Sequence, residues 1–276
     1  MLTKYINKDF AKRFLPPIFL DQISFFRAVL MRIKLRKWLN RNAELRNKYL
    51  GQRVYILGNG PSLNNFDLNI IHGQEVITMN HFELHPQKEK FKIVAHCIGE
   101  PYSSNTWEDP ISMLNGLKAD TYWFNADAVE FFSKQDSYDV RYYLSGLRAS
   151  AQTLSGDDLT GVALQYQSTA QMAINVALFL GFKDIYLLGF DHDWLVTRGS
   201  SPHFYEERDG VDKADLSRFS YIEMIRISLN LFEIYIKLRQ IAKKRDARIW
   251  NLSKPSYLDV FPTLEQAGRK SVSQNT

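Results

Sequence analysis

Short apolar runs, each closed by a glycine or a polar residue, recur between residues 53 and 252 and alternate with stretches of helical periodicity. Apolar runs bounded by such turn signals are typical of buried strands. Strands that alternate with helices predict an α/β protein with a mostly parallel sheet. We expect strands at 53–57, 75–79, 91–96, 121–124, 184–188 and 248–252, and helices at 167–182 and 221–245.

The chain length of 276 residues is enough for one large domain or two small ones. We expect a globular domain at 51–265, preceded by an extension at 1–50 and followed by a polar, disordered tail at 266–276. Cys97 is the only cysteine, which excludes an intrachain disulfide and suits a reducing cytoplasm. The sequence contains no secretory signal, and no stretch is apolar enough to predict a membrane-spanning helix.

The first 50 residues hold most of the positive charge. They contain twelve Lys and Arg against three acidic residues, a net charge of +9, so the remainder carries −4 of the total of +5. The stretch 23–49 has helical periodicity, with apolar residues beside a dense basic face. Such a helix suits the surface of an anionic membrane and predicts a peripheral position on the inner face of the cytoplasmic membrane. A basic helix packed on its own domain or on a partner is an equal alternative, whereas no motif supports nucleic-acid binding.

Four of the predicted strands end in short polar signatures. These signatures begin at Asn59, Asn80, Asn125 and Asp191. In an open parallel sheet, ligands bind beyond the carboxyl ends of the strands. The four signatures are therefore expected to meet in one polar crevice.

The first signature, Gly58-Asn59-Gly60-Pro61-Ser62, is the most informative. Its glycines allow a tight turn and the close approach of a ligand to the backbone. Backbone N–H groups and the Ser62 hydroxyl could hold phosphate oxygens there. The spacing matches neither the dinucleotide fingerprint nor a Walker loop. A tight strand-to-helix connection capped by Ser62 is the structural alternative.

The other strand ends allow a binding role and a structural one. Asn80 and Asn125 can bond a sugar or a base edge, but each can also form an Asx turn. Ser168 and Thr169 precede the helix at 167–182, where N-capping is the simplest role and anion binding is the functional one. The run Asp191-His192-Asp193 could hold a metal ion, but no matching pair of ligands is evident elsewhere, so Asp191 is expected to form hydrogen bonds to the ligand or to the loop.

His203 lies in a polar loop at 199–210. A histidine in a loop beside a crevice is a candidate general base, since its ordinary pKa is near neutral. Such loops often act as lids. An exposed histidine without a catalytic role is equally compatible with the composition.

Four segments in the same order resemble the bacterial family 42 sialyltransferases and, equally, the related DUF115 or MptE-like proteins found among surface-polysaccharide genes, such as those for lipopolysaccharide or capsule. The segments are VYILGNGPSL (54–63), MNHF (79–82), STAQMAINVALFLGFKDIYLLGFD (168–191) and RIWNLSKPSYL (248–258). The resemblance covers residues 53 to 260. It implies a Rossmann-like fold of the GT-A variant type and metal-independent transfer of a sugar from a CMP-activated donor, without a cofactor.

The resemblance also implies residue roles. His203 would be the general base that deprotonates the acceptor hydroxyl, and Tyr205 would stand near the leaving phosphate. The donor would be held by a set of turn and strand-end residues. This set is Gly58, Asn59, Gly60, Ser62, Asn80, Asn125, Ser168, Thr169, Gly189, Asp191 and His192.

Two departures keep alternatives open. His96-Cys97 stands where the family has an asparagine, so the donor sugar can be sialic acid, Kdo or a related sugar. The run at 203–206 is closer to the DUF115 group, which includes a pterin pyrophosphokinase. That reaction would need ATP and Mg²⁺ with carboxylates from Asp127, Asp191 or Asp193. A non-catalytic nucleotide-binding membrane module is the third hypothesis. The acceptor is expected to be a surface glycan or a lipid-linked molecule, and a homo-oligomer is one of the arrangements left open.

Overall fold

The computed structural model describes the backbone of residues 17–99, 114–134, 136–147, 156–197, 203–205 and 219–265, and side chains from residue 26 onward. The predicted tail at 266–276 and most of the predicted loop around His203 lie outside these residues.

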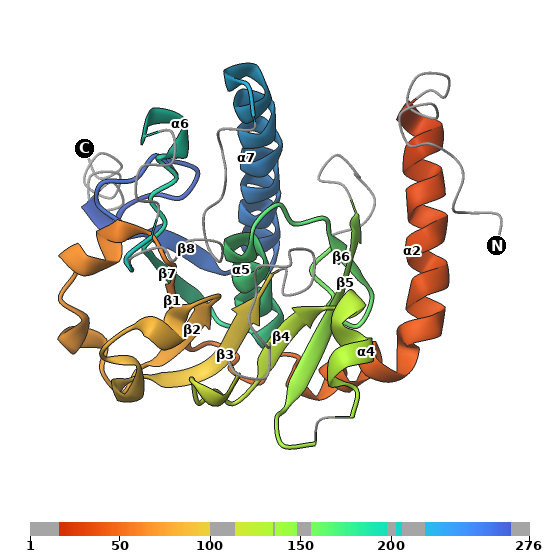
Figure 1. The fold of residues 1–276 in the computed structure, drawn as a ribbon, viewed down its shortest axis with the longest axis horizontal. Helices are drawn as coiled ribbons and strands as arrows, with labels where there is room; N and C mark the ends of the chain where they lie inside the picture. The colour runs from red at the N-terminus through yellow and green to blue at the C-terminus, as the bar shows by residue number, and fades with distance from the viewer. Residues whose placement is uncertain are drawn as a thin grey trace.

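The described residues form an eight-stranded sheet in which every pair of neighbouring strands is parallel. The sheet confirms the predicted Rossmann-like α/β fold (Figure 1). Its strands are β1 Arg53–Leu57, β2 Glu75–Met79, β3 Lys92–Ile98, β4 Tyr122–Asn125, β5 Val140–Leu147, β6 Val162–Leu164, β7 Asp184–Leu188 and β8 Arg248–Asn251.

The order of the strands is β6-β5-β4-β3-β2-β1-β7-β8. From β1 the chain adds five strands in succession on one side, and then crosses back to place β7 on the other side of β1. Adjacent strands that lead away in opposite directions create a crevice beyond their carboxyl ends, which is called the topological switch point. In this fold the switch point lies between β1 and β7.

Helices and short 3-10 segments cover both faces of the sheet. α5 (Thr169–Leu180) and α7 (Tyr221–Lys244) pack on one face, and α7 stands upright in Figure 1. The other face is covered at the β1–β3 end by short 3-10 turns and at the β4–β5 end by α2 (Pro17–Asn40) and α4 (Val129–Phe132). Because side chains alternate along a strand, Ile56 enters the core beneath α5 while Leu57 enters the opposite one.

α5 forms where its local sequence contains both a start and a stop signal. The side chain of Gln171 turns back and accepts hydrogen bonds from the N–H groups of Gln167 (2.7 Å) and Ser168 (3.3 Å). Gly181 ends the helix in the left-handed conformation, with φ of 91°, as its position predicts. Ten residues of the helix are buried, which explains why its apolar pattern has no polar face.

The sequence prediction was incomplete at the β4–β6 end. β5 and β6 were not predicted, because β5 mixes Arg141, Ser145 and Gly146 with its aromatic residues and β6 has only three residues. Arg141 is nevertheless buried, since its guanidinium donates to Asp139 at 2.6 Å and also bonds Glu44.

The N-terminal helix was predicted at 23–49, and α2 instead runs from Pro17 to Asn40 and is followed by a 3-10 turn, Arg41–Leu45. Its inner face packs against β5 through the buried residues Leu35 and Leu39. Asn42 is buried and donates to the carbonyls of Tyr142 and Leu159, both at 2.7 Å. The extension is therefore anchored to the sheet at its C-terminal end. None of the described helices is long and apolar enough to cross a membrane.

Candidate functional site

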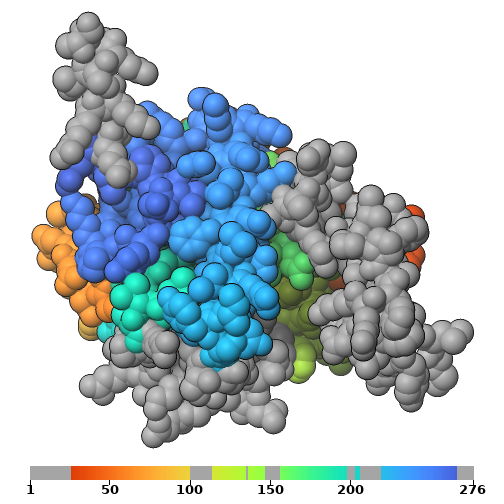
Figure 2. Space-filling view, turned by 90° about the horizontal axis from the view of Figure 1, so that it is seen from above, coloured from red at the N-terminus to blue at the C-terminus, as the bar shows by residue number. Residues whose placement is uncertain are grey.

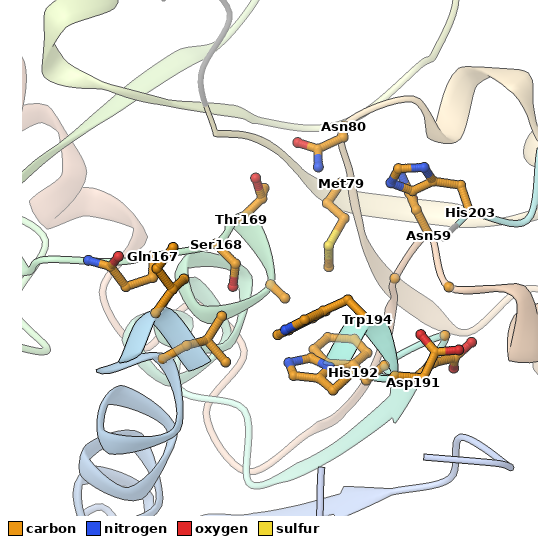
Figure 3. Close-up of a pocket in the computed structure, with 18 of the residues that line it drawn as sticks. Asn59, Met79, Asn80, Gln167, Ser168, Thr169, Asp191, His192, Trp194 and His203 are labelled. Atoms are coloured by element: carbon orange, nitrogen blue, oxygen red, sulfur yellow. The ribbon is translucent and has the colours of Figure 1, made fainter. Parts of the chain in front are cut away.

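A cavity of about 420 Å³ opens at the switch point, beyond the carboxyl ends of β1 and β7 (Figure 3). β2, the N-terminus of α5 and one face of α7 complete its walls. Of the residues predicted from the sequence, those that line it are Gly58, Asn59, Gly60, Asn80, Ser168, Thr169, Gly189, Asp191, His192 and His203. The structure thus brings together most of the predicted set, and it does so at the place where α/β proteins bind ligands.

The glycines of the first turn are required by the contact between β1 and β7. The N–H groups of Gly58 and Gly60 donate to the carbonyls of Leu188 (2.7 Å) and Gly189 (3.0 Å). A Cβ atom at Gly58 would lie 2.5 Å from the carbonyl oxygen of Gly189, which is too close for any side chain. The two N–H groups that we predicted to hold phosphate are therefore already paired within the protein.

Ser62 also has a partner inside the protein. Its N–H donates to one carboxylate oxygen of Asp191 at 2.8 Å, and its hydroxyl bonds the other. Burial raises the pKa of the Asp191 carboxyl, while the two bonds from Ser62 oppose that rise. Ser62 does not line the cavity. The structure gives it a different contact from the predicted phosphate contact: Ser62 and Asp191 tie the β1 turn to the β7 turn.

Asn59 differs from its neighbours, because its side chain is only 7% exposed and lines the cavity. Neither its amide oxygen nor its amide nitrogen has a hydrogen-bond partner within the described part of the chain. An unpaired buried amide costs about 1–3 kcal/mol. In Figure 3 its side chain lies beside His203 at the rim of the cavity. A ligand group that both donates and accepts would satisfy it.

Asn80 and Asn125 have separate surroundings. Asn80 lines the cavity with a left-handed backbone, φ of 47°, and its amide oxygen lies 3.4 Å from the N–H of Gly99. The side chain of Asn125 accepts from the N–H of Asp127 at 3.4 Å and caps the 3-10 turn after β4. It does not line the cavity. The alternative that we kept for each residue, an Asx turn, describes Asn125.

The N-terminus of α5 faces the cavity through Ser168, Thr169 and Ala170. Its first turn contains no acidic residue. The positive end of the helix dipole therefore faces the cavity with no acidic side chain in that turn to offset it. This wall can hold a phosphate or a carboxylate.

Three rings after β7 lie in a row along one wall of the cavity. Phe190 and His192 lie almost parallel at 6.3 Å, and His192 lies 4.8 Å from Trp194. His192 has a left-handed backbone, φ of 56°, and its Nε2 atom is 2.8 Å from the Tyr235 hydroxyl. Burial lowers the pKa of His192 to about 4. The ring is therefore neutral at physiological pH and suits stacking and hydrogen bonding better than proton transfer.

The sequence analysis did not predict the apolar side of the cavity. Met79 and Trp194 lie on opposite sides of the opening in Figure 3, and Met224 and Leu231 come from α7. The spacing of Phe190, His192 and Trp194 at every second position after a strand was an available signal. Met224 and Leu231 belong to an amphipathic helix, and only the tertiary packing decides which apolar face borders a cavity.

His203 stands at the cavity because the residue after it is anchored. The N–H of Phe204 donates to the carbonyl of Asn59 at 2.7 Å, and its ring packs edge-on against Phe82 and His85. Tyr205 stacks on the His203 ring at 5.0 Å but does not line the cavity. His203 is thus held over the turn that contains Asn59.

A pyrophosphokinase would take its carboxylates from Asp127, Asp191 or Asp193, of which Asp191 and Asp193 line the cavity and Asp127 does not. Asp127 is exposed beyond β4, both carboxylate oxygens of Asp191 bond Ser62, and Asp193 lines the cavity. Within the described ranges, no group of three or more His, Cys, Asp or Glu side chains could hold a metal ion.

No protein-family model matches the chain, and no curated protein matches it. Solved structures with a similar backbone include the sialyltransferase CST-II in complex with a trisaccharide acceptor and CMP, at 16% identity and a TM-score of 0.47, covering 76% of this chain and 85% of that one. A second is CstII from Campylobacter jejuni in complex with the substrate analogue CMP-3FNeuAc, at 14% identity and a TM-score of 0.45, covering 77% of this chain and 86% of that one. A third is the MAf glycosyltransferase from Magnetospirillum magneticum AMB-1, at 16% identity and a TM-score of 0.48, covering 80% of this chain and 35% of that one. These similarities concern the arrangement of the backbone.

Proposed function

We propose that this protein is a glycosyltransferase that binds a CMP-activated sugar in the switch-point cavity and transfers the sugar to a hydroxyl of a glycan or lipid-linked acceptor. The observation that carries the proposal is the buried amide of Asn59, which lines the cavity without a partner among the described residues. An amide offers both a donor and an acceptor, which is the pattern that a ribose hydroxyl or a base edge can satisfy. The motifs shared with family 42 sialyltransferases support a cytidine nucleotide.

The anionic part of the donor would bind at the N-terminus of α5. Ser168 and Thr169 lie there, and the helix dipole favours negative charge. The glycine turn would contribute shape instead of free N–H groups, because those of Gly58 and Gly60 are paired with β7. The adjoining rings of His192 and Trp194 would exclude water from the opposite side.

His203 would act as the general base. As an acceptor oxygen attacks the anomeric carbon, its proton would pass to the His203 imidazole. The bond between the anomeric carbon and the phosphate oxygen would break, and CMP would leave with the bonding electron pair. Fixed donors at the α5 N-terminus would stabilise the departing phosphate. This mechanism needs no metal ion or cofactor, in agreement with the resemblance.

The reaction is tested by incubating the purified protein with CMP-linked sialic acid or Kdo, in EDTA and in Mg²⁺, and measuring the release of CMP with and without acceptor. We expect acceptor-dependent release in EDTA. His203→Ala should lower the rate by about 10²–10⁴-fold, because that is the usual contribution of a general base, while CMP affinity is retained. Release of AMP from ATP in the presence of Mg²⁺ and a pterin acceptor, with no release of CMP from the sugar donors, would favour the pyrophosphokinase. CMP binding with no release of either nucleotide would favour the non-catalytic module.

We also propose that α2 places the protein on the inner face of an anionic membrane. The outer face of this helix exposes Phe26, Leu30 and Ile33 at helical spacing. Exposed basic residues flank them, and the segment 26–40 contains no acidic residue. Apolar side chains within a wholly basic surface match the interface of anionic lipids.

Vesicle sedimentation tests the membrane proposal. The protein should bind vesicles that contain phosphatidylserine and remain in solution with pure phosphatidylcholine. The variant Leu30→Glu should reduce the binding. Ile70→Glu, which changes an equally exposed residue in the 3-10 turn Leu68–Ile71, is the control. Equal binding to both vesicle types would contradict the proposal.

A further inference from the structure

α7 exposes a second apolar surface, which is separate from the cavity. Ile222, Ile225, Leu229, Phe232 and Ile236 follow one another at intervals of three, four, three and four residues. We call these five residues the α7 stripe. Leu229 is 60% exposed, and only Phe232 is half-buried. Figure 2 shows this part of α7, in light blue, at the surface of the molecule. The spacing is that of a seam between two packed helices.

The α7 stripe faces away from the core and the cavity. Met224 and Leu231, on the opposite side of the helix, line the cavity, and Tyr235 and Leu238 are buried beneath the helix. At 100° per residue, Leu229 and Leu231 point about 160° apart. Phe232 is the one member that also packs against the core, where its ring lies 6.1 Å from His192. The other four residues of the stripe are exposed and do not line the cavity.

The charges beside the stripe indicate what kind of partner fits it. Along one flank, Glu223, Arg226, Glu233 and Lys237 alternate in sign from the N-terminal to the C-terminal end. A second α7 in antiparallel orientation would present the same series in reverse. Each acidic residue would then meet a basic one, with Arg226 against Glu233 of the other copy. In a parallel pair about a two-fold axis, this flank would meet the opposite flank of the other helix, and the series would not pair with itself.

We propose that a second copy of this chain covers the stripe, with the two α7 helices antiparallel about a two-fold axis near Leu229. The contact is isologous, because Ile222 of one copy lies near Ile236 of the other, and such self-complementary contacts close as dimers. The uniformly basic outer face of α2 would repel a second copy of itself, whereas the alternating flank of α7 attracts one. The inference does not depend on the reaction proposed for the cavity.

Sedimentation equilibrium, with concentrations from about 1 to 100 µM to bracket an ordinary dissociation constant, tests association. We expect the wild-type chain to be a dimer and Leu229→Glu to weaken the dimer at least about tenfold, since two carboxylates would be buried together. Leu30→Glu on α2, a leucine 66% exposed, is the matched control and should leave the dimer unchanged. Arg226→Glu should weaken the dimer, and Arg226→Glu combined with Glu233→Arg should restore it.

Engineered cysteines test the orientation. Cys97 is buried, so a new surface cysteine would be the reactive one. Leu229→Cys should form a disulfide between copies under mild oxidation, while Ile222→Cys should not, because in the antiparallel pair its own counterpart lies roughly 20 Å away along the helix. Ile222→Cys mixed with Ile236→Cys should cross-link. Cross-linking of Ile222→Cys alone would show a parallel pair and overturn the proposal. A monomeric wild-type chain would also overturn the proposal. This holds even if the stripe then proved to bind vesicles.

Discussion

The carboxyl ends of β1 and β4 carry similar sequence signals but have different structures. Asn59 lies two residues after β1 and Asn125 is the last residue of β4, and both residue types are compatible with nucleotide binding. Asn125 accepts a hydrogen bond from the N–H of Asp127 and caps its own turn. Asn59 lines the cavity with a buried amide that has no partner among the described residues.

The difference follows from the order of the strands. β4 lies between β3, which precedes it in the sequence, and β5, which follows it, so the chain continues in one direction across that part of the sheet. β1 lies between β2 and β7, where the chain reverses and leaves a crevice. The same residue type is thus part of a turn in one place and part of a cavity in the other. Four predictions test this contrast, from the largest effect to the smallest.

Gly58→Ala should have the largest effect. The new Cβ atom would lie 2.5 Å from the Gly189 carbonyl oxygen, so β1 and β7 would have to separate. We expect loss of nucleotide binding and a loss of stability of about 1–3 kcal/mol, measured by chemical denaturation. Gly161→Ala is the control, because its Cβ would meet nothing closer than 3.5 Å. Equal effects of the two changes would show that the contact at Gly58 is unimportant.

The second prediction concerns pH. Burial lowers the pKa of His192 from 6.5 to about 4. The unfolded chain therefore takes up a proton below pH 6.5 that the folded chain takes up only near pH 4. Stability should fall across this range, by up to about 3 kcal/mol from this residue. His192→Asn, which tolerates the left-handed backbone, should reduce the fall as followed by thermal unfolding. Burial also lowers the pKa of His96, to about 3, so His96 contributes the same acid destabilisation to the wild type and to the variant. An unchanged pH profile would contradict the assignment.

The third prediction compares Asp191, which follows β7 and bonds Ser62 of the β1 turn, with Asp127, which follows β4. Asp191→Asn weakens the bonds from Ser62 that join the β1 and β7 turns, and hydrogen bonds to a charged group contribute about 1.5–3 kcal/mol. We expect a loss near the lower end of that range, because an amide retains one acceptor. Asp127→Asn changes an exposed side chain and should alter stability by less than about 0.5 kcal/mol. Urea unfolding curves of both variants provide the comparison, and similar losses would remove the distinction.

The smallest effect on folding is expected at the two asparagines, with opposite trends. Asn125→Ala removes a cap and should cost about 1 kcal/mol of stability. Asn59→Ala removes a buried amide without a described partner and should leave the ligand-free protein equally stable or slightly more stable. Thermal unfolding without nucleotide measures both. A larger loss at Asn59 than at Asn125 would mean that Asn59 has a structural role.

The sequence predicts the fold well where local signals agree. β1, β2 and β7 have the predicted bounds, and α5 ends at Gly181 as expected, because apolar runs and turn residues coincide there. β5 was missed because the burial of Arg141 depends on Asp139 and on Glu44, which is distant in sequence. Such a strand cannot be recognised before its ion pairs are known.

The site could be predicted in composition but not in detail. The glycine turn and the residues after β7 were correctly expected to converge. The pairing of Ser62 with Asp191, and of Gly58 with β7, depends on the distance between two turns that are far apart in the sequence. Ser62 and Asp191 are separated by 129 positions. The contributions of Trp194 and Leu231 depend on how α7 packs. Sequence patterns contain neither the distance between the two turns nor the packing of α7.

Calorimetric titration of CMP in EDTA, into the wild-type chain, Asn59→Ala and Asn125→Ala, tests most directly whether the switch-point cavity binds the nucleotide through its unpaired amide. We predict binding to the wild type and to Asn125→Ala with similar affinity, and binding about tenfold or more weaker to Asn59→Ala, because one lost hydrogen bond to a buried group is worth about 1–3 kcal/mol. Equal affinity in all three proteins, or a loss in Asn125→Ala alone, would contradict the account.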